Sequence, residues 1–112
     1  MRLWVDDERP MPPAFDQRTE SSWGTIDLLA GELAAGRMVE LISFDYDLDW
    51  PPHAATNDDT AQPILEWMCA AGFWPGELRF HTANQDGHEW MVDFARCHAP
   101  ETTTIDETDI WL

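Results

Sequence analysis

Polar motifs follow three short apolar runs of the sequence, each run being typical of a buried strand. The motifs are Asp6-Asp7, Asp45-Tyr46-Asp47 and His81-Thr82-Ala83-Asn84. In an open α/β sheet, functional groups collect beyond the carboxyl ends of parallel strands. We therefore expect the three motifs to meet in one crevice, where they would form a single site.

A cluster of carboxylates is the first consequence of this arrangement. Two like charges ~4 Å apart repel by about 4 kcal/mol at an effective dielectric constant of 20. A hard divalent cation such as Mg²⁺ or Mn²⁺ would relieve this repulsion. Asp6-Asp7 alone is typical of a solvated turn, and it is the presence of Asp45 that favours a metal site. We expect Asp6, Asp7 and Asp45 to be the metal ligands.

Asp45 and Asp47 are open to three interpretations. They are a phosphoacceptor with its neighbour, a nucleophile and acid pair, or two metal ligands or acid/base groups. The first two involve phosphoryl transfer, which ordinarily uses a lysine to balance phosphate charge. The sequence contains no lysine, so Arg9, Arg79 or a metal would have to take its place.

The third motif supplies groups that could act on a phosphate. His81 is a candidate general acid or base near neutral pH, and Thr82 and Asn84 are candidate phosphate ligands. The alternatives are a structural histidine and turn hydrogen bonds. Arg18 fits a phosphate contact and an ion pair with a carboxylate equally well.

Charge limits the classes of partner. The 112 residues include 22 acidic and 6 basic side chains, giving a net charge of −16, which opposes an extended nucleic-acid-binding surface. A nucleotide would need local capture by a metal and a few arginines. The same acidity is compatible with a protein that mimics nucleic acid and occupies a basic partner.

Length and hydropathy predict one domain, residues 1–112, in the cytoplasm. The sequence contains no run of 18 apolar residues, so we expect no membrane-spanning helix. We also find no signal-peptide pattern before the first predicted strand. Cys69 and Cys97 fall within predicted helices, where we expect buried structural thiols.

Alternating strand and helix patterns predict an α/β fold with a short, mostly parallel sheet flanked by helices. The long loop 47–59 is of the kind that carries function. The predicted strands are 2–5, 14–18, 39–44, 77–80 and 109–112, and the predicted helices are 19–35, 59–72 and 86–97.

Helical spacing also predicts which side chains face the core. In the first helix these are Trp23, Ile26, Leu29 with Ala30, and Leu33. Elsewhere, His53 and His88 are expected at the surface. Trp50, in the long loop, is the best candidate for stacking on a nucleobase.

Taken in order, these motifs resemble the cyclic-phosphate processing receiver-like (cREC) family, a divergent relative of response-regulator receiver domains. The resemblance spans residues 2–95. It implies a compact three-layer receiver-like Rossmannoid domain acting on cyclic phosphates, such as the 2′,3′-cyclic ends of cleaved RNA. The residues that carry it are Leu3-Trp4-Val5-Asp6-Asp7-Glu8-Arg9-Pro10, Arg18-Thr19, Ile42-Ser43-Phe44-Asp45-Tyr46-Asp47-Leu48, and His81-Thr82-Ala83-Asn84 with Gly87 and Met91.

The resemblance also implies roles for individual residues. Asp6 and Asp7 correspond to the acidic metal-binding pair, Asp45 to the phosphoacceptor position, and Asp47 with residues 81–84 to an additional polar set. The chain departs from the family pattern at Thr60-Ala61-Gln62-Pro63, at Gln85 and at His88. These departures affect the expected substrate more than the expected fold.

The leading hypothesis is a metal-dependent phosphoesterase acting on a cyclic-phosphate nucleotide or RNA end. Asp6, Asp7 and Asp45 would hold Mg²⁺ or Mn²⁺, His81 would protonate the leaving oxygen, and Asp47 would orient His81 or water. Thr82, Asn84, Arg9 and Arg18 are the expected substrate contacts. A non-catalytic module that binds a cyclic nucleotide or a protein partner, and an acidic mimic of nucleic acid, are the alternatives.

Overall fold

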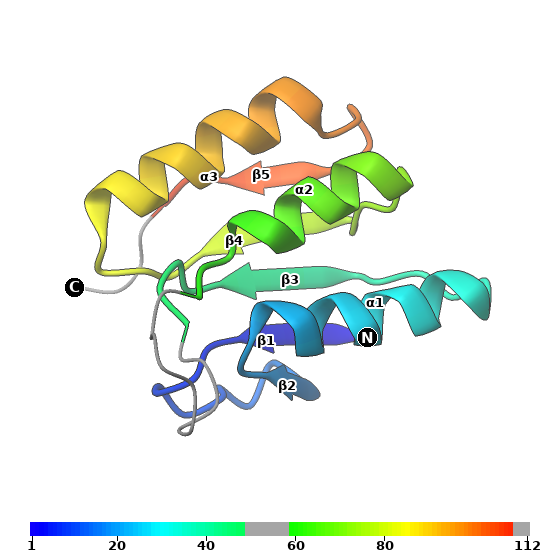
Figure 1. Ribbon diagram of the computed structural model, residues 1–112, viewed down its shortest axis with the longest axis horizontal. Helices are drawn as coiled ribbons and strands as arrows, with labels where there is room; N and C mark the ends of the chain where they lie inside the picture. The colour runs from blue at the N-terminus through cyan, green and yellow to red at the C-terminus, as the bar shows by residue number, and fades with distance from the viewer. Residues whose placement is uncertain (49–58, 109–112) are drawn as a thin grey trace.

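The computed structural model describes residues 1–48 and 59–108. Its centre is a five-stranded parallel sheet with the strand order β2-β1-β3-β4-β5 (Figure 1). This strand order is shared with flavodoxin-like folds, and the expected α/β receiver-like fold is confirmed. The elements are β1 Arg2–Val5, β2 Gln17–Thr19, α1 Ser22–Ala34, β3 Leu41–Phe44, α2 Gln62–Ala71, β4 Glu77–Phe80, α3 Gln85–His98 and β5 Thr104–Asp106.

The expected third layer is not found in the described residues, because α1, α2 and α3 pack side by side on one face of the sheet (Figure 1). The reason lies in the topology. The connections β2-α1-β3, β3-α2-β4 and β4-α3-β5 all step across the sheet in the same direction. Right-handed crossovers that step in one direction place every helix on the same side.

Strand alternation divides the buried side chains between the two faces. Leu3 and Val5 of β1 and Ile42 and Phe44 of β3 join the helices in the main core. The intervening Trp4 points to the opposite face. There it forms a second cluster with Leu41 and with Phe15 from the segment between β1 and β2. Each strand therefore contributes alternate residues to two different environments.

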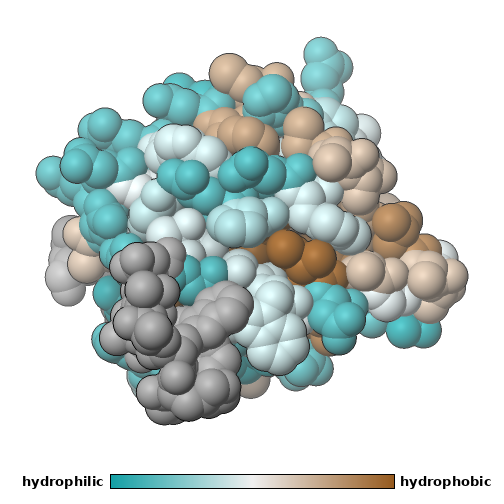
Figure 2. Space-filling model, in the orientation of Figure 1, coloured by the Kyte–Doolittle hydropathy of each residue, from teal (hydrophilic) through white to brown (hydrophobic). Residues whose placement is uncertain are grey.

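Helix α1 shows where periodicity misjudged the core. The helix is capped by Ser21, whose hydroxyl accepts from the Gly24 amide, so it begins later than the predicted start at residue 19. Leu29 is buried as predicted, but Trp23 and Leu33 are 55% and 44% exposed. The helical face of the molecule mixes hydrophilic and hydrophobic side chains (Figure 2).

Several other expectations need correction or lie outside the described residues. Cys69 is half-buried and Cys97 is exposed, so the buried thiol predicted at position 97 is wrong. His88 is half-buried against the Phe80 ring, not exposed. The described chain contains no helix long and apolar enough to cross a membrane. Trp50, His53 and the predicted strand 109–112 lie outside the described residues, and β5 forms earlier in the chain, at 104–106.

Most strand and helix bounds agree with the predictions to within a few residues. The prediction was right for 2–5 and 77–80, whereas the segment 14–18 becomes a strand only at 17–19. Pro63 occupies the first turn of α2, as expected for a residue that lacks an amide hydrogen. Gly72 ends this helix in the left-handed conformation, with φ 65°.

Candidate functional site

Parallel register brings the ends of three strands together. Val5 pairs with Phe44, and Phe44 pairs with Phe80. The ladder continues one residue beyond the strands, because the Asp45 amide donates to Val5 at 2.9 Å and the His81 amide donates to Phe44 at 2.8 Å. The first residues of the three polar motifs therefore lie next to each other at the carboxyl edge, as the sequence predicted.

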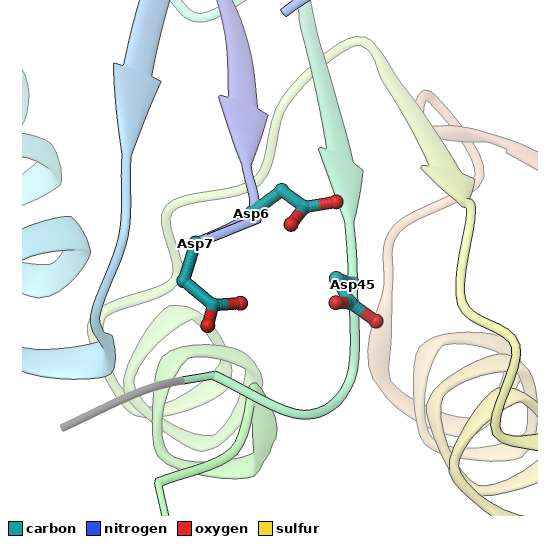
Figure 3. A group of neighbouring side chains, drawn as sticks. All are labelled: Asp6, Asp7 and Asp45. Atoms are coloured by element: carbon teal, nitrogen blue, oxygen red, sulfur yellow. The ribbon is translucent and has the colours of Figure 1, made fainter. Parts of the chain in front are cut away.

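Three carboxylates converge at this edge, from the ends of β1 and β3 (Figure 3). One carboxylate oxygen from each of Asp6, Asp7 and Asp45 lies within 4.8 Å of the other two. Oxygen ligands that are this close and negatively charged suit a hard cation such as Mg²⁺ or Mn²⁺. The donor set therefore fits the expected metal.

The carboxylate of Asp6 is fully buried and accepts four hydrogen bonds. Its Oδ1 accepts from the amides of Glu8 and Arg9 at 2.8 and 3.1 Å. Its Oδ2 accepts from His81 Nε2 at 2.9 Å and from Arg9 Nη1 at 3.3 Å. Burial alone would raise the pKa of Asp6, but the bonds from His81 and the two amides lower it to about 2. Asp6 is thus held as an anion.

His81 lies beneath the carboxylates and is fully buried. Its Nδ1 is 2.7 Å from the Ser43 hydroxyl, and its ring stacks on Trp4 with centroids 3.7 Å apart and planes 4° apart. Nε2 faces the Asp6 anion and donates to it, so the Ser43 hydroxyl is the partner of the other ring nitrogen, Nδ1. His81 is not among the described residues that line the pocket, so the geometry places it behind Asp6 and not against a ligand.

Asp45 differs from Asp6 in its electrostatics. Burial raises the pKa of this carboxyl group; a hydrogen bond with Thr82 opposes the rise and the negative charge of Asp6 adds to it. Arg9 Nη1 lies 3.4 Å from Asp45 Oδ2, so one guanidinium bridges the two carboxylates. The like-charge repulsion expected from the sequence is therefore visible at Asp45.

The segment after β1 holds Arg9 in place. The carbonyl oxygen of Arg9 accepts from Trp4 Nε1 at 3.3 Å and from Arg18 Nη1 at 2.6 Å. Arg18 also pairs with Glu20 at 3.3 Å, so its observed contacts are with the chain itself. Arg79 pairs with Glu77 within β4. Of the three arginines considered for phosphate, Arg9 lines the pocket in the described part of the chain.

A pocket of about 230 Å³ opens beside the carboxylates. Its polar lining is rich in acidic groups from the ends of β1 and β3 and is completed by the turn before α3. Among the described residues, the lining consists of Asp7, Glu8, Arg9, Asp45, Asp47, Leu48, Thr82, Ala83 and Asn84. The structure thus brings most of the predicted site residues together around one cavity.

Thr82 and Asn84 also stabilise the turn that leads into α3. Thr82 Oγ1 accepts from the Asn84 amide at 3.1 Å, and Asn84 Oδ1 caps α3 by accepting from the Gly87 amide at 2.9 Å. The other end of the amide, Nδ2, donates to Asp47 Oδ2 at 3.1 Å. Thr82 and Asn84 therefore both stabilise the turn and line the pocket.

Sequence reasoning missed the residues that support the site. Trp4 and Ser43 fix the ring of His81, and Tyr46 packs against Gly87 at the start of α3. Tyr46 also accepts from Gln62 Nε2 at 2.5 Å, which ties the Asp45–Asp47 segment to α2. The available signal was strand alternation, since positions 4 and 43 share a face with the acidic residues that follow them.

Comparison with known proteins places most of the chain in a family. The family model described as the cyclic-phosphate processing receiver domain matches residues 1–96. Neither the curated proteins nor the solved structures contain a match to this chain. The matched region includes all three polar motifs and α3 almost to its end.

Proposed function

Because the chain belongs to the cyclic-phosphate processing receiver domain family, we propose that it is a metal-dependent phosphoesterase acting on cyclic phosphates, such as the 2′,3′-cyclic ends of RNA or nucleotides. One observation carries this proposal. The oxygen ligands of Asp6, Asp7 and Asp45 converge beside a cavity that also contains an arginine, a threonine and an asparagine. Such a cavity offers both a cation site and hydrogen-bond donors to a phosphate.

The cation would be Mg²⁺ or Mn²⁺, held by Asp6, Asp7 and Asp45. When bound, it would supply Lewis-acid catalysis by withdrawing charge from the phosphate and lowering the pKa of a coordinated water. The three carboxylates would also keep the ion at the carboxyl edge of the sheet. The low pKa of Asp6, about 2, keeps this ligand ionised at physiological pH.

The remaining pocket residues would bind and orient the ligand. Arg9 would supply N–H donors to phosphate oxygens and is the cation among the described pocket residues. The single O–H of Thr82 is hydrogen-bonded to Asp45, so it would bind a phosphate oxygen only by exchanging that partner. Asp47 and Asn84 are joined by a hydrogen bond of 3.1 Å, so Asp47 fixes the orientation of the amide that faces the cavity. We therefore assign Asp47 a positioning role together with Asn84.

The position of His81 changes its proposed role. A general acid has to reach the leaving oxygen directly or through one water, and His81 is fully buried with both ring nitrogens hydrogen-bonded. We propose instead that it positions Asp6, as buried hydrogen-bonding partners do for metal ligands. The Ser43 hydroxyl and the Trp4 ring keep His81 in that orientation.

A second candidate function is a receiver-like module that binds a cyclic phosphate without cleaving it. The observation that favours it is the same burial of His81. The described residues that line the pocket contain no histidine, and turnover would need another proton donor. Metal-dependent binding without product would support this candidate.

The test incubates the protein with a 2′,3′-cyclic nucleotide and Mg²⁺ or Mn²⁺ and monitors ring opening by phosphorus NMR. We expect turnover by the wild-type protein and none by Asp45→Asn, because this change removes a metal ligand. The matched control is Asp27→Asn, which makes the same chemical change at an exposed position of α1.

Each outcome is informative. Turnover in wild type and Asp27→Asn alone establishes the phosphoesterase and identifies the bond that breaks. Full activity in Asp45→Asn removes the proposed site. Ligand shifts that depend on the metal, without a new phosphorus signal, assign the pocket to a binding module.

A further inference from the structure

The four hydrogen bonds at Asp6 limit how a cation can reach it. An ionised carboxylate offers about four lone-pair sites, and the Asp6 oxygens already accept from four donors. A metal ion that uses this carboxylate directly must therefore displace one of them. Which donor leaves follows from how firmly each is held.

Three of the four donors are fixed by the fold. Two are the main-chain amides of Glu8 and Arg9, in the turn directly after β1. The third is Nε2 of His81, whose ring lies fully buried against Trp4 and is bonded to Ser43. Displacing any of these would disrupt backbone or core packing. Such a disruption leaves a buried donor without an acceptor, which is unfavourable.

The fourth donor is Nη1 of Arg9, on a side chain that is 27% exposed. The same nitrogen lies 3.4 Å from Asp45 Oδ2, so it occupies a position between two of the three carboxylates that would hold the ion. Because the guanidinium is partly exposed, it can regain water when it leaves, whereas the other three donors are held by the backbone or the core. Arg9 is thus the donor with the lowest cost of displacement.

The main chain of Arg9 would stay in place during such an exchange. Trp4 and Arg18 both donate to its carbonyl oxygen, and Asp6 accepts from its amide. The guanidinium can therefore leave the carboxylates only by turning about its own side-chain bonds. Because Arg9 lines the cavity, it would remain within the pocket.

We propose that a divalent cation and the Arg9 guanidinium compete for Asp6 and Asp45, and that cation binding releases Arg9 to bind the anionic group of the ligand. This inference rests on the proposed function and adds an order to it: cation first, phosphate second. Arg9 then acts as an internal counter-ion in one state and as a phosphate ligand in the other. Binding of the cation therefore strengthens binding of the phosphate, and binding of the phosphate strengthens binding of the cation by the same factor.

The proposal predicts an effect opposite to that of an ordinary site mutation. Replacing Arg9 with Gln removes the competitor, so Mg²⁺ should bind more tightly by at least roughly fivefold, the upper limit for an exposed ion pair, because the carboxylates here are more buried. The same replacement should abolish the ability of inorganic phosphate to tighten Mg²⁺ binding. A purely structural arginine would show neither result.

Isothermal titration calorimetry with Mg²⁺, in the absence and presence of inorganic phosphate, tests both effects. The proteins are wild type, Arg9→Gln and Arg37→Gln. The last variant removes the same charge from an exposed pair with Glu32 after α1, and it controls for net charge. Thermal unfolding of each variant checks that the fold is retained.

Tighter Mg²⁺ binding in Arg9→Gln than in both other proteins, with the coupling to phosphate lost, supports the proposal. Unchanged or weaker Mg²⁺ binding in Arg9→Gln overturns it, and so does coupling that persists in this variant. The ring-opening assay separates this result from the proposed function. Turnover without competition refutes the Arg9 exchange alone, whereas competition without turnover refutes only the phosphoesterase.

Discussion

The contact between Gly87 and Tyr46 yields a prediction whose sign is opposite to that of intrinsic helix propensity. A Cβ atom at Gly87 would lie 2.3, 2.6 and 2.8 Å from the Cγ, Cδ2 and Cβ atoms of Tyr46. These tyrosine atoms are close to the main chain, so they cannot swing away as a flexible side-chain end would. Gly87→Ala must therefore displace Tyr46 or the first turn of α3.

The size of the effect can be worked out from opposing terms. Overpacking in a closed site costs about 1–3 kcal/mol, and moving Tyr46 would also break its 2.5 Å hydrogen bond with Gln62, at about 1 kcal/mol. Alanine in a helix recovers about 1 kcal/mol relative to glycine. We expect a net loss of about 2 kcal/mol, or roughly 8 °C in Tm for a chain of this size.

Urea unfolding and thermal melts, both followed by circular dichroism, measure this change. The matched control is Gly31→Ala, because Gly31 is exposed within α1 and a Cβ atom there would meet nothing within 4 Å. The control should gain about 1 kcal/mol. In a Tyr46→Ala background, which removes the two nearest ring atoms but keeps the Cβ atom at 2.8 Å, the penalty at Gly87 should become smaller. A Gly87→Ala protein as stable as wild type would refute the reasoning.

Two further predictions concern acid and charge. The pKa of Asp6, lowered from 3.8 to about 2, means that its stabilisation is present above 3.8 and is lost as pH falls toward 2. The shift corresponds to about 2 kcal/mol, so urea unfolding should find Asp6→Asn less stable than wild type at pH 7, with the difference shrinking toward pH 2. The pKa of Asp45 is raised, chiefly by burial, so the stability associated with its neutral form is lost as pH rises through the folded-state value. Asp45→Asn should therefore be more stable than wild type at neutral pH, and equal stability of the two proteins at pH 7 would contradict the raised pKa.

The acidic edge of the sheet was predictable because its signals are local. Buried parallel strands read as continuous apolar runs, and the residues that follow them must emerge at the carboxyl edge. Asp6 and Asp45 were placed correctly on that basis, and the parallel pairing of Val5 with Phe44 brings them together. The same logic placed Thr82 and Asn84 at the pocket.

The position of His81 could not be derived with the same reliability, because it depends on contacts across three strands. Its ring meets Trp4 and Ser43, which lie on β1 and β3, and neither contact is apparent from spacing along the chain. Alternation would have placed His81 on the same face as Arg79 and Ser43, since these positions pair in register. That information appears only once the register is known.

The exposure of Trp23 has a different cause. Helix α1 carries apolar residues on more than one face, so a 3.6-residue period fits several orientations. The observed orientation buries Thr25, whose hydroxyl donates to the Ser21 carbonyl and lies 2.7 Å from Thr19 Oγ1. Likewise, the placement of all three helices on one face follows from strand order, which is a non-local property.

The alternation of side chains in β1 and β3 has a consequence for how such a domain can change over generations. The residues of these strands that face the helices and stabilise the fold are Leu3, Val5, Ile42 and Phe44. The alternate positions 4 and 43 lie on the other face, which they share with Asp6 and Asp45. Substitutions on the chemical side therefore leave the helical core intact, and Asp45→Asn is even expected to strengthen the fold. Descendants of this chain could lose their chemistry without losing their architecture, so inheritance of the fold would be a poor guide to inheritance of the activity.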